Sequence, residues 1–575
     1  MTRVPRGLPL LGLLVATHSV FAQGLPAVNT ASRDLHSNAN PRQVRVTHVD
    51  LDLTVLFAEK QLRGTAILDV ERAPGVPARA PLVLDTRGLT VLSVATNEGP
   101  DGPWTEAKYT LGTEDKVLGQ ALTITLTPAT KRVRVGYRTS PTATALQWLA
   151  PAQTAGGAKP FLFSQSQAIH ARSWVPLQDS PSVRVTFNAT IRVPDGLKAL
   201  MAADRLPHEG NAFKFAMTQA IPPYLIALAV GDLEFQEIGP RTGVWAEPSI
   251  LKAAAFEFAD TEKMIDAAEV LYGPYRWGRY DILVLPPSFP FGGMENPKLT
   301  FATPTVIAGD RSLVDLVAHE LAHSWSGNLV TNASWRDFWL NEGFTTFLER
   351  RILGVLYGAK RESMEQDLGL QSLRRDFAAL PPRDQVLAID LRGRSPEEGT
   401  TDVPYEKGRL FLDWVESRLG SAALDALLRE WFEGHAFQSA STEQFREFLL
   451  ARATSLKPGA LEAGQVDEWL YQPGLPAFAV LKSSDVFARV DAQRADWLAG
   501  RVTLAALPSR DWSVYEWIHF LDGMPVELSR ERAGQLEAQF GLNGVRNAEI
   551  ACSWLRLAIR AGYEPARPRL EEYLT

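Results

Sequence analysis

The five residues 319–323, His-Glu-Leu-Ala-His, carry the clearest chemistry in the chain. Apolar residues at helical spacing flank His319 and His323, which predicts that both histidines lie on one helix. Side chains four positions apart share a helix face, so both imidazoles can reach the same metal ion. Glu320 lies beside them and can act as a general base toward a water molecule at that metal.

A catalytic zinc site of this type takes three protein ligands and leaves one position for water. Glu342 lies 19 positions beyond His323, far enough for a turn and a second helix. We therefore predict one Zn²⁺ per chain, bound by His319, His323 and Glu342. Nitrogen and oxygen ligands suit zinc in a hydrolase, but they do not exclude other divalent metals. The alternative of unrelated histidines and a solvated glutamate is disfavoured because the chain has only 9 His.

A second motif, Gly292-Gly293-Met294-Glu295-Asn296, precedes the histidines. A glycine pair lets the backbone approach a ligand closely. Glu295 beside it could bind the ammonium group of a substrate. By itself the pattern is equally compatible with an ordinary polar loop.

The elements that must position these residues change in type along the chain. Apolar residues alternate with polar ones over 44–57, with one phase slip, and again over 183–193. Such alternation is typical of antiparallel sheets with one buried face. From about residue 250 helical patterns dominate: Ala253–Leu271 is predicted to be one helix, and Ile282–Leu285 a short buried strand.

Ser312 and Asp315 are typical of a capping box at the start of the helix that carries the histidines. Beyond a Pro-Gly-Leu-Pro turn at 473–476, further helices are predicted at Val486–Leu498 and Ala548–Ala561. We therefore predict a multidomain α+β protein. It has an N-terminal antiparallel β domain (23–232), a mainly helical catalytic domain (233–473) and an all-α C-terminal helical domain (474–575).

Composition excludes several classes of protein. The 575 residues are too many for one hydrophobic core, and the net charge of -7 leaves no basic footprint for nucleic acid. Cys552 is the only cysteine, so no intramolecular disulfide can form.

The N-terminus has the layout of a cleavable signal peptide, 1–22. Arg3 and Arg6 precede an apolar run over 7–20, and small residues at 20 and 22 suit a cleavage site. An uncleaved membrane anchor is disfavoured because the run is short for a bilayer. We therefore expect an exported protein, periplasmic or secreted, with no stable membrane span after cleavage.

The stretch from Pro286 to Arg351 resembles the gluzincin zinc aminopeptidases, most closely the branch that contains leukotriene hydrolase and aminopeptidase B. The resemblance continues, in the same order, at 163–170, 403–408, 469–476 and 554–557. It implies a thermolysin-like catalytic domain and peptide substrates with a free N-terminal amine. We expect the protein to be a monomer.

The resemblance also implies a role for each matching residue. His319, His323 and Glu342 match the zinc ligands, Glu320 matches the general base, and Tyr405 matches the tyrosine that stabilises the tetrahedral oxyanion. The residues that match substrate-binding positions are Glu295, Gly292, Gly293, Met294, Gln165 and Gln167. Glu397 stands near the position at which leukotriene hydrolase has an aspartate that is tied to its epoxide chemistry. It could favour substrates that begin with Arg or Lys, although broad specificity is equally compatible.

Two alternatives remain from the sequence. A lipid-epoxide hydrolase is disfavoured by Phe291 and Thr400, which stand where leukotriene hydrolase has tyrosines. A non-catalytic zinc-binding or peptide-binding protein is disfavoured because the ligands, base and tyrosine are all present.

Overall fold

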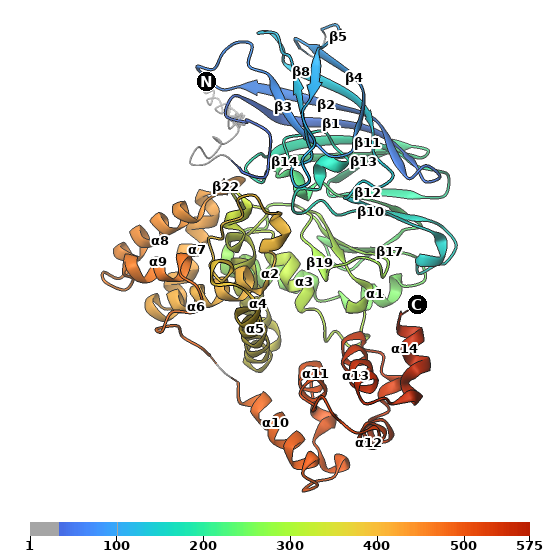
Figure 1. The fold of residues 1–575 in the computed structure, drawn as a ribbon, viewed down its shortest axis with the longest axis vertical. Coiled ribbons are helices and arrows are strands. Elements are labelled where there is room, and N and C mark those ends of the chain that lie inside the picture. The colour runs from blue at the N-terminus through green and yellow to red at the C-terminus, as the bar shows by residue number, and fades with distance from the viewer. Residues whose placement is uncertain (1–33, 100–101, 483, 575) are drawn as a thin grey trace, which may run out of the picture.

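The computed structural model describes residues 34–99, 102–482 and 484–574. It has the predicted three-part architecture, with strands at the N-terminal end and the helices α10 to α14 at the C-terminal end (Figure 1). The predicted signal peptide, 1–22, lies outside the described residues. The boundaries at 232 and 473 stay predictions.

The described residues of the N-terminal domain form strands and short 3₁₀ turns. Its strands are β1 (Val44–Leu56), β2 (Gln61–Arg72), β3 (Leu82–Thr86), β4 (Thr90–Asn97), β5 (Thr105–Glu106), β6 (Tyr109–Leu111), β7 (Gln120–Ile124), β8 (Arg132–Arg138), β9 (Leu146–Leu149), β10 (Phe161–Ser164), β11 (Val185–Arg192), β12 (Lys198–Met201), β13 (Asp204–Glu209), β14 (Ala212–Ile221) and β15 (Leu228–Gly231). They form an eight-stranded sheet (β13-β14-β11-β1-β2-β8-β4-β5), a four-stranded sheet (β12-β15-β10-β9) and a three-stranded sheet (β3-β7-β6).

The large sheet explains the phase slip in the alternation over 44–57. It also contains one pair of neighbouring strands whose relative direction differs from the prediction. The β1–β2 register shifts between Val46 and His48, so a β-bulge moves the buried face by one residue. Most neighbours are antiparallel, as predicted, but β1 and β11 are parallel, with Val49 opposite Phe187. Alternation reports which face is buried and carries no information on the direction of the neighbouring strand.

The catalytic domain combines a small sheet with a helical body. The sheet has five strands in the order β16 (Glu234–Glu237), β17 (Thr242–Ala246), β18 (Tyr280–Val284), β20 (Leu299–Ala302) and β19 (Gly293–Met294). A separate pair is formed by β21 (Val330–Asn332) and β22 (Gln438–Ala440). The helices are α1 (Leu251–Glu257), α2 (Thr261–Tyr272), α3 (Asp315–Ala322), α4 (Trp339–Tyr357), α5 (Ala359–Ala379), α6 (Gly408–Leu419), α7 (Ser421–Gly434), α8 (Thr442–Leu456) and α9 (Ala463–Tyr471).

Of two local predictions in this domain, one is confirmed and the other is wrong. The predicted strand at Ile282–Leu285 is confirmed as β18. The single helix predicted over Ala253–Leu271 is instead α1 and α2, because the chain turns at 258–260, where the Thr261 hydroxyl donates to the Phe258 carbonyl at 2.7 Å.

The C-terminal domain contains α10 (Asp485–Leu498), α11 (Val514–Asp522), α12 (Arg530–Phe540), α13 (Ala548–Arg560) and α14 (Arg567–Leu574). Both helices predicted here are confirmed, as α10 and α13. In the described part of the chain, no helix combines the length and the apolar character needed to cross a bilayer.

Two hydrophobic cores meet near the predicted site. One runs through the helices of the catalytic and C-terminal domains. The other fills the β domain and extends to Met294, Trp335 and Phe338 of the catalytic domain, with Tyr405 packed against it. The predicted catalytic residues therefore lie where the β domain and the helical body join.

Candidate active site

His319 lies in α3, His323 is the C-cap residue directly after α3, and Glu342 lies in α4, so the two helices bring the three predicted zinc ligands together. The Nε2 atoms of His319 and His323 are 3.2 Å apart, and each lies 3.4 to 3.5 Å from Oε2 of Glu342. Ligand atoms about 2.0–2.1 Å from a tetrahedral zinc ion are separated from one another by roughly 3.3 Å. The triangle therefore has the size that a zinc ion requires.

The charge around this triangle also fits a cation. The Oε2 atoms of Glu320 and Glu342 are buried and accept no hydrogen bond from the described residues. Neither carboxylate forms an ion pair with a lysine or arginine of the described chain, and neither does that of Glu295. Buried unpaired carboxylates are costly, and a metal ion between the histidines would offset that cost.

The outward-facing nitrogens of the two histidines have different partners. Nδ1 of His319 lies 2.9 Å from Oε2 of Glu349, whereas Nδ1 of His323 lies 3.1 Å from both the Ser326 carbonyl and the Thr345 hydroxyl. A proton held at Nδ1 by such a partner leaves the Nε2 lone pair free for a metal. The sequence reasoning missed these partners. Glu349 could have been identified from the sequence, because it lies two helical turns after Glu342 and therefore on the same face of α4.

The environment of Glu320 depends on the glycine pair. A Cβ added at Gly293 would lie 2.4 Å from Oε1 of Glu320, so only glycine fits against this carboxylate. Burial raises the pKa of Glu320 well above its ordinary value, although His319 opposes the shift. A basic carboxyl group held beside the metal triangle suits a group that accepts and returns a proton.

Glu295 is also buried, at 3% exposure, directly after β19. Its carboxylate accepts from the amide of Asn341 at 3.4 Å, and its backbone carbonyl accepts from Asn328 at 2.7 Å. Oxygen atoms of Glu295 and Glu320 and a ring nitrogen of His323 lie within 4.8 Å of one another. Burial raises the pKa of Glu295, with His323 opposing the shift.

Three other predicted substrate-binding residues differ in placement. Gln167 lines the site cavity together with Gly292 and Gly293. The amide of Gln165 lies 3.3 Å from the sulfur of Met294, and the Met294 side chain packs into the core of the β domain. Gln165 Oε1 and Gln167 Nε2 are buried without a hydrogen-bond partner in the described chain, so both amides have unused capacity.

Tyr405 lies in a short π-helical segment, Val403–Lys407, that leads into α6. Its ring is nearly parallel to that of His319, with centroids 6.2 Å apart. A Cβ at Gly343 would lie 2.7 Å from Cα of Gly408, so this glycine contact lets the Tyr405 segment approach α4. Burial raises the pKa of Tyr405 well above its ordinary value, so the phenol keeps its proton and can donate it in a hydrogen bond.

These groups face a cavity of ≈ 480 Å³ whose walls include Phe291, Leu316, Phe338, Glu397 and Thr400. Glu397 accepts from His170 of the β domain at 3.1 Å. Burial alone would raise the pKa of Glu397, but hydrogen bonds from His170 and Ser395 lower it to about 2. This wall of the cavity is therefore anionic at any ordinary pH.

Proteins of known function match nearly the whole chain. Leukotriene A-4 hydrolase of Xenopus laevis is 39% identical over 93% of this chain and 90% of its own length. Human aminopeptidase B is 35% identical over 96% of this chain and 89% of its own. The solved structure of native leukotriene A4 hydrolase from Saccharomyces cerevisiae superposes with a TM-score of 0.85 and 33% identity, over 96% of this chain and 91% of that one.

These relatives correct one prediction from the sequence. The relatives that match this chain over most of its length are intracellular proteins, so the prediction of an exported, periplasmic or secreted protein is wrong.

Three family models match in the order of the three domains. The M1 peptidase N-terminal domain matches residues 45–225, the peptidase family M1 domain matches 256–467, and the leukotriene A4 hydrolase C-terminal domain matches 512–575. M1 enzymes use a catalytic zinc ion, in agreement with the triangle of donor atoms described above. With the identity to full-length relatives, these matches place the chain in peptidase family M1, as a zinc metallo-aminopeptidase.

Proposed function

We propose that this enzyme hydrolyses the first peptide bond of peptides with a free N-terminal amine, using Glu320 as general base. The observation that carries the proposal is the buried, unpaired carboxylate of Glu295 beside the His319–His323–Glu342 triangle. A substrate ammonium group would supply its missing counter-charge. That pairing would fix the scissile bond one residue from the end of the peptide.

In this proposal His319, His323 and Glu342 hold the zinc ion. Zinc held there supplies Lewis acidity, which makes water nucleophilic at neutral pH and polarises a carbonyl oxygen. Glu320 takes a proton from the attacking water and later passes it to the leaving amine, as its position and raised pKa allow. Tyr405 donates a hydrogen bond to the oxygen that gains negative charge in the transition state.

The remaining predicted residues would bind the substrate. Gln167 lines the cavity with Glu295 and has an unused amide nitrogen, and Gln165, which contacts Met294, has an unused amide oxygen. Gly292 and Gly293 let a peptide backbone come close. We propose that Glu397 contacts the first side chain of the substrate and favours a cationic one. The predicted monomeric state stays a prediction.

A second candidate function is the hydrolysis of a lipid epoxide. It is favoured by the identity to a protein named leukotriene A-4 hydrolase and by the apolar residues Phe291, Leu316 and Phe338 in the cavity. The same cavity buries Glu295, however, which a fatty epoxide has no group to neutralise.

The test is a panel of fluorogenic aminoacyl amides, each assayed with a free and an acetylated amine, with and without a zinc chelator. We expect turnover only with a free amine and bound zinc, and the largest kcat/KM for arginyl or lysyl amides. Zinc-loaded protein without activity on any free-amine substrate contradicts the proposal. Turnover of a fatty epoxide by that protein would support the second candidate.

A further inference from the structure

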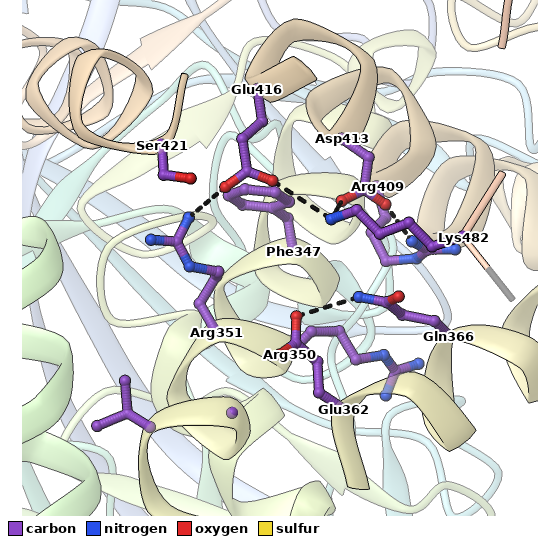
Figure 2. A pocket seen from close by; sticks show the side chains of 12 residues that line it. Phe347, Arg350, Arg351, Glu362, Gln366, Arg409, Asp413, Glu416, Ser421 and Lys482 are labelled. Atoms are coloured by element: carbon purple, nitrogen blue, oxygen red, sulfur yellow. Dashed lines mark hydrogen bonds and ion pairs between the residues drawn. The ribbon is translucent and has the colours of Figure 1, made fainter. Parts of the chain in front are cut away.

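Helix α4 continues from Glu342 into a second charged cavity, of ≈ 390 Å³ (Figure 2). Four cationic side chains line it, and each is paired with at least one carboxylate: Arg350, Arg351, Arg409 and Lys482. A charged ligand would have to break one of these pairs to form its own. We therefore place no binding site in this cavity. Its ion pairs are informative for another reason: they connect to residues next to the active site.

Arg350 is the point where these pairs converge. Its guanidinium donates to Glu349 at 2.7 Å, to Glu365 of α5 at 2.9 Å and to Glu406 at 3.2 Å. The side chain is 12% exposed, so these bonds form in a poorly solvated environment. The planar guanidinium has five donors in a fixed geometry, which a lysine ammonium cannot reproduce.

Two of these carboxylates lie directly behind predicted catalytic groups. Glu349 is the partner of His319 Nδ1, at 2.9 Å. Glu406 follows Tyr405 in the π-helical segment, and its second oxygen accepts from Arg409 at 2.8 Å. One guanidinium therefore joins the carboxylate behind a metal ligand to the segment that carries the phenol.

We propose that Arg350 is a positioning residue that fixes His319 and Tyr405 relative to one another. The inference about Tyr405 rests on the proposed function, whereas that about His319 needs only a bound metal. Arg350 acts through Glu349: by holding that carboxylate in place 2.9 Å from Nδ1 of His319, it keeps the His319 ring oriented toward the metal.

The C-terminal domain reaches the same network. The Tyr515 hydroxyl of α11 donates to Glu365 at 3.0 Å, and Arg361 bonds both Glu365 and Asp315, the first residue of α3.

The capping box predicted for Ser312 and Asp315 is wrong, because both side chains bond to other partners. Asp315 pairs with Arg361, and the Ser312 hydroxyl accepts from Asn547 of the C-terminal domain at 3.0 Å. The C-terminal domain thus supports the start of α3, which carries His319 and ends next to His323.

The test measures the zinc dissociation constant by competition with a chromophoric chelator. Removal of a partner behind a metal ligand typically weakens metal binding by 10–100-fold, so Glu349→Gln sets the reference loss. We expect Arg350→Gln to weaken zinc binding about tenfold. The double variant should bind zinc no more weakly than Glu349→Gln alone, because Arg350 acts through Glu349.

Arg351→Gln is the matched control. It removes the same charge from the same helix and cavity, but Arg351 pairs with Glu416 and Asp425, which lie away from His319. The control should keep the wild-type zinc affinity and kcat, whereas Arg350→Gln should lower kcat with little change in KM. If Arg350→Gln does not fold, as judged by circular dichroism, Arg350→Lys replaces it in the same comparisons.

Unchanged zinc affinity in the Arg350 variant, or losses that multiply in the double variant, would overturn the proposal. Inactivity of the wild-type enzyme on free-amine substrates would instead count against the proposed function. It would leave the zinc comparison intact, so the two failures are distinguishable.

Discussion

Helix α4 contributes to two charged cavities that differ in how their charges are balanced. In the cavity of Figure 2, carboxylates alternate with arginines and a lysine, and every cation is paired. In the cavity around the histidines, Glu295, Glu320 and Glu342 are buried with no lysine or arginine of the described chain paired to them. The two cavities are of similar size, ≈ 390 and ≈ 480 Å³, so volume does not separate them.

The difference between the two cavities shows which buried charged groups indicate a catalytic or binding site. A paired network is already satisfied and contributes mainly packing and rigidity. Buried carboxylates without cationic partners carry an electrostatic cost, which a bound cation offsets. A metal ion and a substrate ammonium group together would do so. The predictions below test this comparison.

Glu320→Gln should have the largest effect, because it removes the proton carrier and leaves the metal triangle intact. Positioned general bases contribute about 10²–10⁴-fold to the rate, so we expect a loss of kcat in that range. Initial rates, with zinc content measured by atomic emission, give the result. A variant that binds zinc fully and retains wild-type kcat would remove Glu320 from the mechanism.

Tyr405→Phe keeps the ring that stacks near His319 and removes only the hydroxyl. By comparison with the loss of one oxyanion donor, kcat should fall by about 10²–10³-fold with little change in KM. Steady-state kinetics on the best amide of the panel measures both. An equal fall in kcat and rise in KM would indicate a role in substrate binding instead.

Lys407 lies outside both cavities and challenges the comparison, because it is a buried amine with no carboxylate partner among the described residues. It is fully buried, and its ammonium donates only to the carbonyls of Gln385 and Gln472, at 2.8 and 2.7 Å. Burial lowers its pKa to about 7. An unfolded lysine titrates near 10.4, so between these values the unfolded chain binds more protons. Stability should therefore rise with pH across that window, by at most about 1.4 kcal/mol per pH unit.

The measurement compares thermal unfolding of the wild type and of Lys407→Met from pH 7 to 10. The variant is less stable overall, because two carbonyls lose their donor, but it should lack this part of the pH dependence. Parallel curves for the two proteins would show that Lys407 keeps an ordinary pKa.

Lys482→Ala should have the smallest effect. Its ammonium pairs with Asp413 and Glu416, but the side chain is 44% exposed. Exposed ion pairs contribute about 0.2–1 kcal/mol, so the melting temperature should fall slightly and kcat/KM should not change. A large loss of activity would mean that the paired cavity takes part in the function, against the comparison drawn here.

Features that depend on local spacing could be predicted from the amino-acid sequence alone. The four-residue interval between His319 and His323 places both imidazoles on one helix face in any fold that keeps the helix. Alternation over 44–57 predicted a strand with one buried face, and the bulge at Val46 explains its phase slip. The three-part α+β architecture followed from the change of period along the chain.

Contacts between segments far apart in the chain became visible only in the three-dimensional structure. Glu397 pairs with His170, Arg350 joins Glu349 to Glu406, and Asp315 pairs with Arg361 instead of capping its own helix. Strands β1 and β11 are parallel although their alternation is like that of antiparallel strands. The physical reason is that periodicity records which face of an element is buried. The partner on that face is set by packing between distant segments.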